Sequence, residues 1–202
     1  LRCDWKLPWC SIVSASDASD SGYGICVSSW DAPEVARVGR MSERTRFRRA
    51  PGLSAREAFF TTEGFLQGDD GEWDFTTGGS NFGNGEIPGW IRDLDFPEVP
   101  VELLAPSAWV PLVARPWHDK EKIFLSEARA LVRALDVMVA CFDLKSVRVL
   151  QLVDNMAVCL SFDRRRSRDF TALSLIRKFV ALALAFNLKV VVRWIPSEVN
   201  TS

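Results

Sequence analysis

The sequence predicts an α/β protein with a mixed five-stranded sheet, three antiparallel strands followed by parallel strands, flanked by helices. Three observations favour this class. Residues 11–16 and 22–28 are two apolar segments joined by a short turn next to Gly22, which is typical of a β-hairpin. The segment VRVLQLV at 147–153 has almost no polar alternation, as expected of a parallel strand buried on both faces. Helical segments alternate with strands in the second half of the chain, which predicts βαβ crossovers.

The other elements follow from hydrophobic periodicity. We expect further strands at 108–117 and 188–195, and helices at 126–142, 155–162 and 169–186. In the first of these helices one apolar stripe recurs at spacings of three and four, through Ala128, Leu131, Leu135, Met138 and Phe142. Asn187 is placed to end the last helix in the left-handed conformation.

Composition excludes several classes of protein and site. The 202 residues carry a net charge of −1 and are 48% hydrophobic, which indicates a globular chain and favours neither a membrane surface nor nucleic acid as a partner. Five cysteines without a CxxC pair are expected to be reduced thiols of an intracellular protein. The single histidine, His118, argues against a Cys/His zinc site. No membrane span is expected, because the apolar run FVALALAF at 179–186 has only eight residues.

Three carboxylates occupy positions where α/β folds build sites. Asp17 ends the first strand, Asp154 follows the strand at 147–153, and Glu127 lies in the first turn of the helix expected at 126–142. If the two strands are parallel neighbours, their carboxyl ends lie roughly 5–10 Å apart. Three clustered carboxylates repel one another unless cations neutralise them, and oxygen ligands suit Mg²⁺ or Mn²⁺. We therefore expect Asp17, Glu127 and Asp154 to converge on metal ions.

Simpler interpretations exist for the same residues. Asp17 alone would suit a turn, as Asp20 does beside Gly22. Glu127 could favour a helix N-terminus electrostatically, and Asn155 is expected to cap the helix that it precedes.

Four motifs in order resemble the ribonuclease H domain of retrotransposon polyproteins: SASDASDSGYG, LSEARALVRAL, LQLVDNMAV and VVVRWIPSEVNTS. Asp17, Glu127 and Asp154 fall on three acids of that family. The resemblance implies one RNase H-like domain over 1–202, with its core at 9–30 and 108–202 and an insertion at 31–107. Within the insertion we expect a short helix at 53–65. The glycine-rich segment 67–90 is expected to be the most mobile part and dispensable for the core.

The resemblance implies a function as well as a fold. It implies an endonuclease that cuts the RNA strand of RNA–DNA hybrids during reverse transcription of a retroelement, inside a polyprotein that includes a reverse transcriptase domain. Two Mg²⁺ (or Mn²⁺) ions would be held by the three acids, with Asp17 shared between them. The family also carries a fourth acid and a C-terminal helix, which would follow Ser202, so we expect weakened activity in this chain and expect it to be a piece of a longer protein.

Two interpretations stay open. The run DRRRSRD at 163–169 could contact phosphates through Arg164, Arg165, Arg166 and Arg168, or could be a solvated turn laced by ion pairs. The whole chain could also be a non-catalytic RNase H-like scaffold or nucleic-acid-binding module in a larger assembly.

Overall fold

The computed structural model describes residues 6–49, 90–93 and 95–197. The expected helix at 53–65, nearly all of the glycine-rich segment 67–90 and the loop at 198–202 lie outside the described residues. The chain divides into a core unit, Leu1–Glu43 with Pro97–Ser202, and a second unit, Arg44–Phe96. Among the described residues, no helix has the length and apolar character that crossing a bilayer requires.

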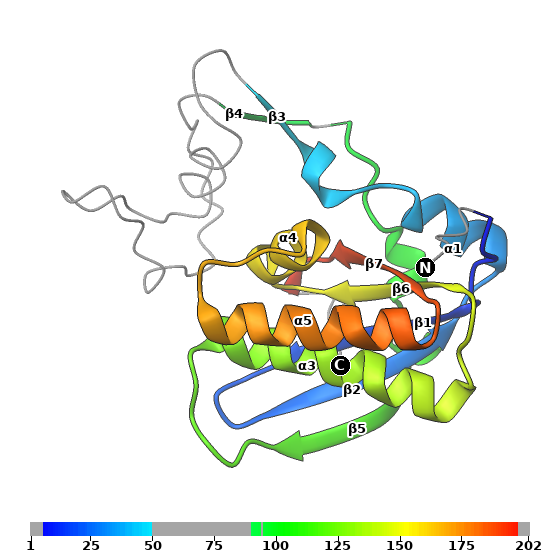
Figure 1. Cartoon of the computed structure of the whole chain (residues 1–202). Coiled ribbons are helices and arrows are strands. Elements are labelled where there is room, and N and C mark those ends of the chain that lie inside the picture. The colour runs from blue at the N-terminus through cyan, green and yellow to red at the C-terminus, as the bar shows by residue number, and fades with distance from the viewer. Residues whose placement is uncertain (1–5, 50–89, 94, 198–202) are drawn as a thin grey trace. The chain divides into compact units, whose positions relative to one another are not determined.

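A five-stranded sheet with the order β5-β2-β1-β6-β7 forms the centre of the core unit (Figure 1). Its strands are β1 (Ile12–Ala18), β2 (Gly22–Ser29), β5 (Val110–Pro116), β6 (Arg148–Val153) and β7 (Lys189–Trp194). The pairs β1–β2 and β2–β5 are antiparallel, whereas β1–β6 and β6–β7 are parallel. The predicted fold class is confirmed, and the predicted strand ends agree within about two residues.

In the described part of the chain, the α-helices that accompany the sheet are α1 (Ala32–Gly39), α3 (Ile123–Phe142), α4 (Met156–Arg164) and α5 (Phe170–Ala185). Their ends follow from local chemistry. The Asn155 side chain accepts a hydrogen bond from the backbone N–H of Val158 at 3.1 Å, so Asn155 is the N-cap that was expected. Asp169 caps α5 in the same way, and Asn187 adopts φ 51° beyond the end of α5, as predicted.

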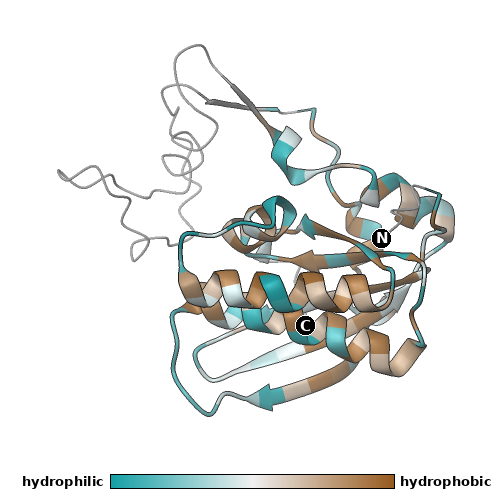
Figure 2. Cartoon of the chain, viewed as in Figure 1, coloured by the Kyte–Doolittle hydropathy of each residue, from teal (hydrophilic) through white to brown (hydrophobic). Residues whose placement is uncertain are grey.

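Two hydrophobic clusters cover opposite faces of the sheet. Val149 and Val153 of β6 belong to a cluster that α3, α4 and α5 complete, whereas Leu150 and Leu152 point the other way. The second cluster includes Val35 and Val38 of α1. It also includes Val99 and Leu104, which follow the second unit in the chain. Figure 2 shows the hydrophobic residues gathered in α3, α5 and the strands behind them.

Helix α1 lies inside the segment 31–107, for which the sequence predicted no helix before residue 53. Its start is marked by a proline in the first turn, Pro33, and by Glu34, both of which favour a helix N-terminus. The helix buries Val35 and Val38 in the second cluster. This part of the predicted insertion therefore contributes to the core unit.

The second unit contains a short antiparallel pair of strands, β3 (Phe47–Arg49) and β4 (Trp90–Arg92). The backbone N–H of Asp93 donates to the carbonyl of Arg46 at 2.9 Å, and the Arg46 guanidinium lies 4.3 Å from the centre of the Phe96 ring. These contacts bring together the two ends of the unit.

Candidate metal centre

Two of the three candidate acids are brought together by the parallel pairing of β1 with β6. The register pairs Ser14 with Gln151 and Ser16 with Val153, so the next residues along the two strands are Asp17 and Asp154. Both carboxylates are half-buried at the carboxyl ends of adjacent strands. Side chains at such ends meet at one edge of the sheet.

The third acid, Glu127, comes from helix α3, which packs against β1. The helix begins at Ile123, so Glu127 lies in the second turn, and the expectation that it lies in the first turn is wrong. The apolar residues Ile123, Phe124 and Leu125 extend the helix by about one turn at its start. An electrostatic role at the helix N-terminus therefore does not account for Glu127. Its side chain is only 5% exposed.

One carboxylate oxygen from each of Asp17, Glu127 and Asp154 lies within 4.8 Å of the other two. Two oxygens bound to the same Mg²⁺ at about 2.1 Å can be at most about 4.2 Å apart. The cluster is thus close to the size that one ion requires, and wide enough for a pair of ions. All three donors are hard oxygen ligands, the type that Mg²⁺ and Mn²⁺ prefer.

An unpaired buried oxygen supports this fit. Among the described residues, no group hydrogen-bonds to the Oε2 atom of Glu127, which is buried. An acceptor that is removed from water without a partner costs free energy. A proton or a cation at this oxygen would remove that cost.

The pKa values of the cluster show how strongly it favours neutralisation. Burial, and then the negative charges of Asp154 and Asp17, raise the pKa of Glu127 to about 9, although the backbone N–H of Ala18 acts in the opposite direction. Burial and the charge of Asp154 raise the pKa of Asp17 to about 6. A divalent cation bound between these carboxylates would lower both pKa values, because its positive charge favours the ionised form.

Neighbouring residues position Asp154 through the backbone. The indole N–H of Trp194, at the end of β7, donates to the Asp154 carbonyl at 2.8 Å. The backbone N–H of Trp194 in turn donates to the Glu43 carboxylate at 3.2 Å, and Glu43 forms a fully buried ion pair with Arg193 at 2.6 Å. The sequence analysis identified neither this role of Trp194 nor Glu43.

The other residues singled out in the sequence do not join the cluster. Asp20 is exposed in the turn between β1 and β2, where the hydroxyl of Ser19 accepts hydrogen bonds from the backbone N–H groups of Ser21 and Gly22. His118 is exposed beyond the end of β5.

The arginine run between α4 and α5 is not uniform. The Arg165 guanidinium donates to the backbone carbonyls of Phe162 and Val190 and lies over the ring of Phe179. Arg165 thereby holds the end of α4 against β7. Arg166 and Arg168 are exposed, and Arg164 is half-buried. Their contact with phosphate stays a prediction.

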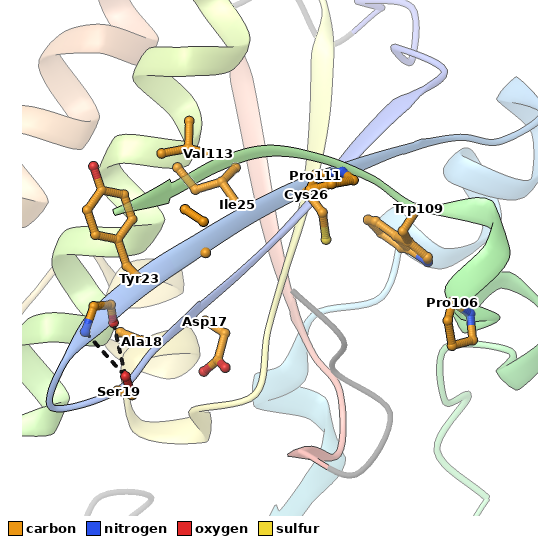
Figure 3. A pocket seen from close by; sticks show the side chains of 13 residues that line it. Asp17, Ala18, Ser19, Tyr23, Ile25, Cys26, Pro106, Trp109, Pro111 and Val113 are labelled. Atoms are coloured by element: carbon orange, nitrogen blue, oxygen red, sulfur yellow. Dashed lines mark hydrogen bonds between the residues drawn. The ribbon is translucent and has the colours of Figure 1, made fainter. Parts of the chain in front are cut away.

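A groove of about 360 Å³ opens beside the cluster (Figure 3). Asp17 lines it at one end, and Trp109 and Pro106 line it at the other. Its floor is formed by β1, β2 and β5. The groove therefore shares a carboxylate with the candidate metal centre.

The solved structures to which this chain is similar include three ribonucleases H. The N-terminal RNase H domain of Rv2228c from Mycobacterium tuberculosis, solved as a fusion with maltose-binding protein, is 13% identical and has a TM-score of 0.44, with 94% of this chain and 90% of that chain covered. RNase H1 from Halobacterium salinarum is 10% identical at a TM-score of 0.44, with 94% and 88% covered. LC11-RNase H1 in complex with RNA/DNA hybrid is 13% identical at a TM-score of 0.46, with 94% and 88% covered.

The sequence matches no protein-family model and no curated protein.

Proposed function

We propose that this chain is a divalent-metal-dependent nuclease that cleaves the RNA strand of RNA–DNA hybrids. The observation that carries the proposal is the cluster of Asp17, Glu127 and Asp154, whose ligand oxygens lie within 4.8 Å of one another. The order of the strands supports it, because the cluster stands at the carboxyl ends of β1 and β6, where α/β sheets place their sites.

The three carboxylates would hold Mg²⁺ or Mn²⁺, as a pair of ions. When held by these residues, the ions would supply Lewis-acid activation of a water molecule and charge neutralisation at the phosphate and at the leaving 3′ oxygen. The chain itself supplies the rigid frame: the β1–β6 pairing fixes Asp17 and Asp154, and helix α3 brings Glu127 to them. A preorganised frame of this kind is what metal-assisted hydrolysis requires of a protein.

The substrate class and the biological setting rest on the motif resemblance. A hybrid would be recognised by its backbone, its 2′-hydroxyls and its helical shape. Arg166 and Arg168, exposed between α4 and α5, are the most accessible of the candidate phosphate contacts Arg164, Arg165, Arg166 and Arg168. We propose that the activity serves the reverse transcription of a retroelement, within a polyprotein that includes a reverse transcriptase domain, and the four sequence motifs support this setting.

The test is cleavage of a labelled RNA–DNA hybrid with and without Mg²⁺, with the same RNA single-stranded as the substrate control. We expect cleavage of the hybrid that EDTA abolishes and that Asp17→Asn also abolishes. Asp136→Asn is the matched control, because Asp136 is a partly exposed acid on α3 that pairs with Arg133 at 3.7 Å, outside the cluster.

The outcomes separate the two functions that the sequence leaves open. Metal-dependent cleavage lost only in the cluster variant supports the nuclease. Binding of the hybrid without cleavage, equal in the wild type and in Asp17→Asn, would instead support the non-catalytic scaffold.

A further inference from the structure

The backbone of the turn after β1 faces the candidate metal centre. The N–H of Ser19 donates to the carbonyl of Gly22 at 2.8 Å, across the β1–β2 pair. Successive residues of a paired strand direct their N–H groups to alternate sides, so the N–H of Ala18 points away from β2, toward the side of β6. The parallel pairing of β1 with β6 ends two residues before Ala18. The Ala18 N–H therefore lies beyond this pairing, at the edge of the sheet where Asp17 and Asp154 meet.

The N–H of Ala18 is a hydrogen-bond donor to the cluster itself. It donates to the carboxylates of Asp17 and Glu127 and partly offsets the raised pKa of each. Because this donor belongs to the backbone, its direction depends on the conformation of the turn and not on a side-chain rotamer. Whatever holds the turn therefore also holds the direction from which these two carboxylates are bonded.

Trp117, the half-buried residue that follows β5, holds this turn from outside the cluster. Its indole N–H donates to the carbonyl of Ser19 at 3.1 Å, and its backbone N–H donates to the carbonyl of Ser21, also at 3.1 Å. Its ring stacks on Tyr23 of β2, with the ring centres 4.4 Å apart and the planes inclined by 26°. The backbone N–H of Ser19 is thus bonded by Gly22, and its carbonyl by Trp117.

Gly22 lets the end of β5 come this close to the turn. A Cβ atom at Gly22 would lie 2.6 Å from the carbonyl oxygen of Arg115, so a larger residue would push the two strands apart. Trp117 follows Arg115 by two residues, and its two bonds to the turn depend on this approach.

The two aspartates of the cluster are supported in the same way. The indole N–H of Trp194 donates to the carbonyl of Asp154, and the indole N–H of Trp117 donates to the carbonyl two residues after Asp17. Trp194 ends β7, and Trp117 directly follows β5. These are the two edge strands of the sheet. Each strand end that carries an aspartate is therefore bonded by an indole from the edge strand on its own side.

We infer that Trp117 is a positioning residue of the metal centre. It holds the Ser19 carbonyl and with it the turn, so that the N–H of Ala18 keeps its direction toward the cluster. The inference rests on the proposed function, because it assigns a role toward the same metal ions. A residue that only packs contributes stability alone, whereas a residue that positions metal ligands also lowers the Mg²⁺ concentration that the site requires.

The test compares two tryptophan variants of the whole chain. Trp117→Phe keeps a ring against Tyr23 and removes the indole N–H. Trp109→Phe is the matched control, because it also removes one indole bond, to the carbonyl of Leu103, away from the cluster. The melting temperature is measured by differential scanning fluorimetry in EDTA and over a series of Mg²⁺ concentrations, so the measurement does not depend on cleavage.

We expect both variants to be slightly less stable than the wild type in EDTA, because each loses one hydrogen bond. Trp117→Phe should also need about 3- to 10-fold more Mg²⁺ for half-maximal stabilisation, less than the roughly 10- to 100-fold typical of partners bonded directly to a metal ligand. Trp109→Phe should need no more Mg²⁺ than the wild type. Hydrogen exchange in EDTA should be faster over residues 17–22 in Trp117→Phe alone.

The outcomes separate this role from the function on which it rests. If Mg²⁺ stabilises the wild type and Trp117→Phe equally at each concentration, Trp117 only packs, and the nuclease stands. Faster exchange over residues 17–22 without a higher Mg²⁺ requirement also overturns the role, because the turn would then be held by Trp117 without positioning the carboxylates. If Mg²⁺ neither stabilises the wild type nor supports cleavage of the hybrid, both proposals fail together.

Discussion

Among single residues, Glu127 is the one whose neutral form suits the folded core and whose ionised form suits the proposed metal site. Its side chain is almost fully buried, and its Oε2 atom has no hydrogen-bond partner among the described residues. Because its pKa is raised to about 9, the metal-free protein holds this carboxyl mostly protonated at neutral pH. A bound cation would displace that proton and stabilise the negative charge of the carboxylate, which the core alone does not stabilise.

Glu127→Gln should therefore change stability and activity in opposite directions. Without metal at pH 8, the neutral amide should raise the melting temperature, because no carboxylate has to be buried. The rise in melting temperature on adding Mg²⁺ should shrink, and hybrid cleavage should fall by at least about 100-fold. Asp136→Asn, on the same helix, should change none of these. An unchanged Mg²⁺ effect in Glu127→Gln would remove Glu127 from the set of metal ligands.

The raised pKa values also predict an unusual pH dependence. A carboxyl whose pKa is higher in the folded state stabilises the protein most below its unfolded value, and this contribution is lost as the pH rises through the folded value. For Asp17 the window runs from 3.8 to about 6, and for Glu127 from 4.5 to about 9. In EDTA, the wild type should lose stability relative to Glu127→Gln between pH 5 and pH 9.

The same titration predicts that Mg²⁺ stabilises the wild type more at pH 8.5 than at pH 6, because the ion competes with protons for the same oxygens. Differential scanning fluorimetry at several pH values, with and without Mg²⁺, measures both effects. A wild-type melting temperature that rises steadily relative to Glu127→Gln in EDTA would contradict the raised pKa of Glu127.

Among the elements, the sequence predicts best those whose positions depend on local pattern. Asp17 and Asp154 lie at the ends of the apolar strands β1 and β6. Both strand ends can be predicted from hydrophobicity alone. Asn155 and Asn187 mark helix ends through their own side-chain and backbone preferences. A metal site built on strand ends is therefore largely visible in the sequence.

Contacts between distant segments are what the sequence does not show. Glu43 is fully buried against Arg193, 150 residues away, and nothing in the pattern around either residue identifies the other as its partner. Trp194 could be assigned to sheet packing, but its bond to the Asp154 carbonyl depends on how β7 ends beside β6. Helix α1 did carry a local signal, in Pro33 and Glu34, which sequence reasoning overlooked.

The Trp194 bond makes a prediction about the element that carries Asp154. Trp194→Phe keeps the ring but removes the N–H that holds the Asp154 carbonyl. We expect a loss of about 1 kcal/mol in stability, and about a 10-fold rise in the Mg²⁺ concentration needed for half-maximal stabilisation. Trp109→Phe is the matched control, since its indole bonds the Leu103 carbonyl at 3.1 Å and not a carbonyl of the cluster. Equal Mg²⁺ requirements in the two variants would make Trp194 a packing residue only.

For the whole molecule, Arg193 on β7 joins the two segments of the core unit between which the second unit lies in the chain. Its Nε atom bonds the Glu43 carboxylate at 2.6 Å, and its two terminal nitrogens donate to the carbonyls of Val38 at 2.6 Å and Pro97 at 2.7 Å. Glu43 and Pro97 are the residues of the core unit at which the second unit begins and ends. The buried guanidinium of Arg193 therefore holds the segment that ends at Glu43 close to the segment that begins at Pro97.

This arrangement predicts that the core unit folds without residues 45–95. Six glycine and serine residues reach about 20 Å when extended, enough to join two segments that contact the same guanidinium. We expect the shortened chain to unfold cooperatively and to keep the stabilisation by Mg²⁺, because Asp17, Glu127 and Asp154 all belong to the core unit. Thermal unfolding with and without Mg²⁺ measures both properties.

A second deletion, of residues 43–95 with the same linker, is the matched control. It removes Glu43 and leaves the Arg193 charge buried without that carboxylate, which typically costs about 3–5 kcal/mol. We expect this chain to be far less stable than the one that keeps Glu43, although the two differ by only two residues. If both deletions unfold alike, the Glu43–Arg193 pair does not hold the boundary. If even the longer chain fails to fold, residues 45–95 are part of what stabilises the sheet.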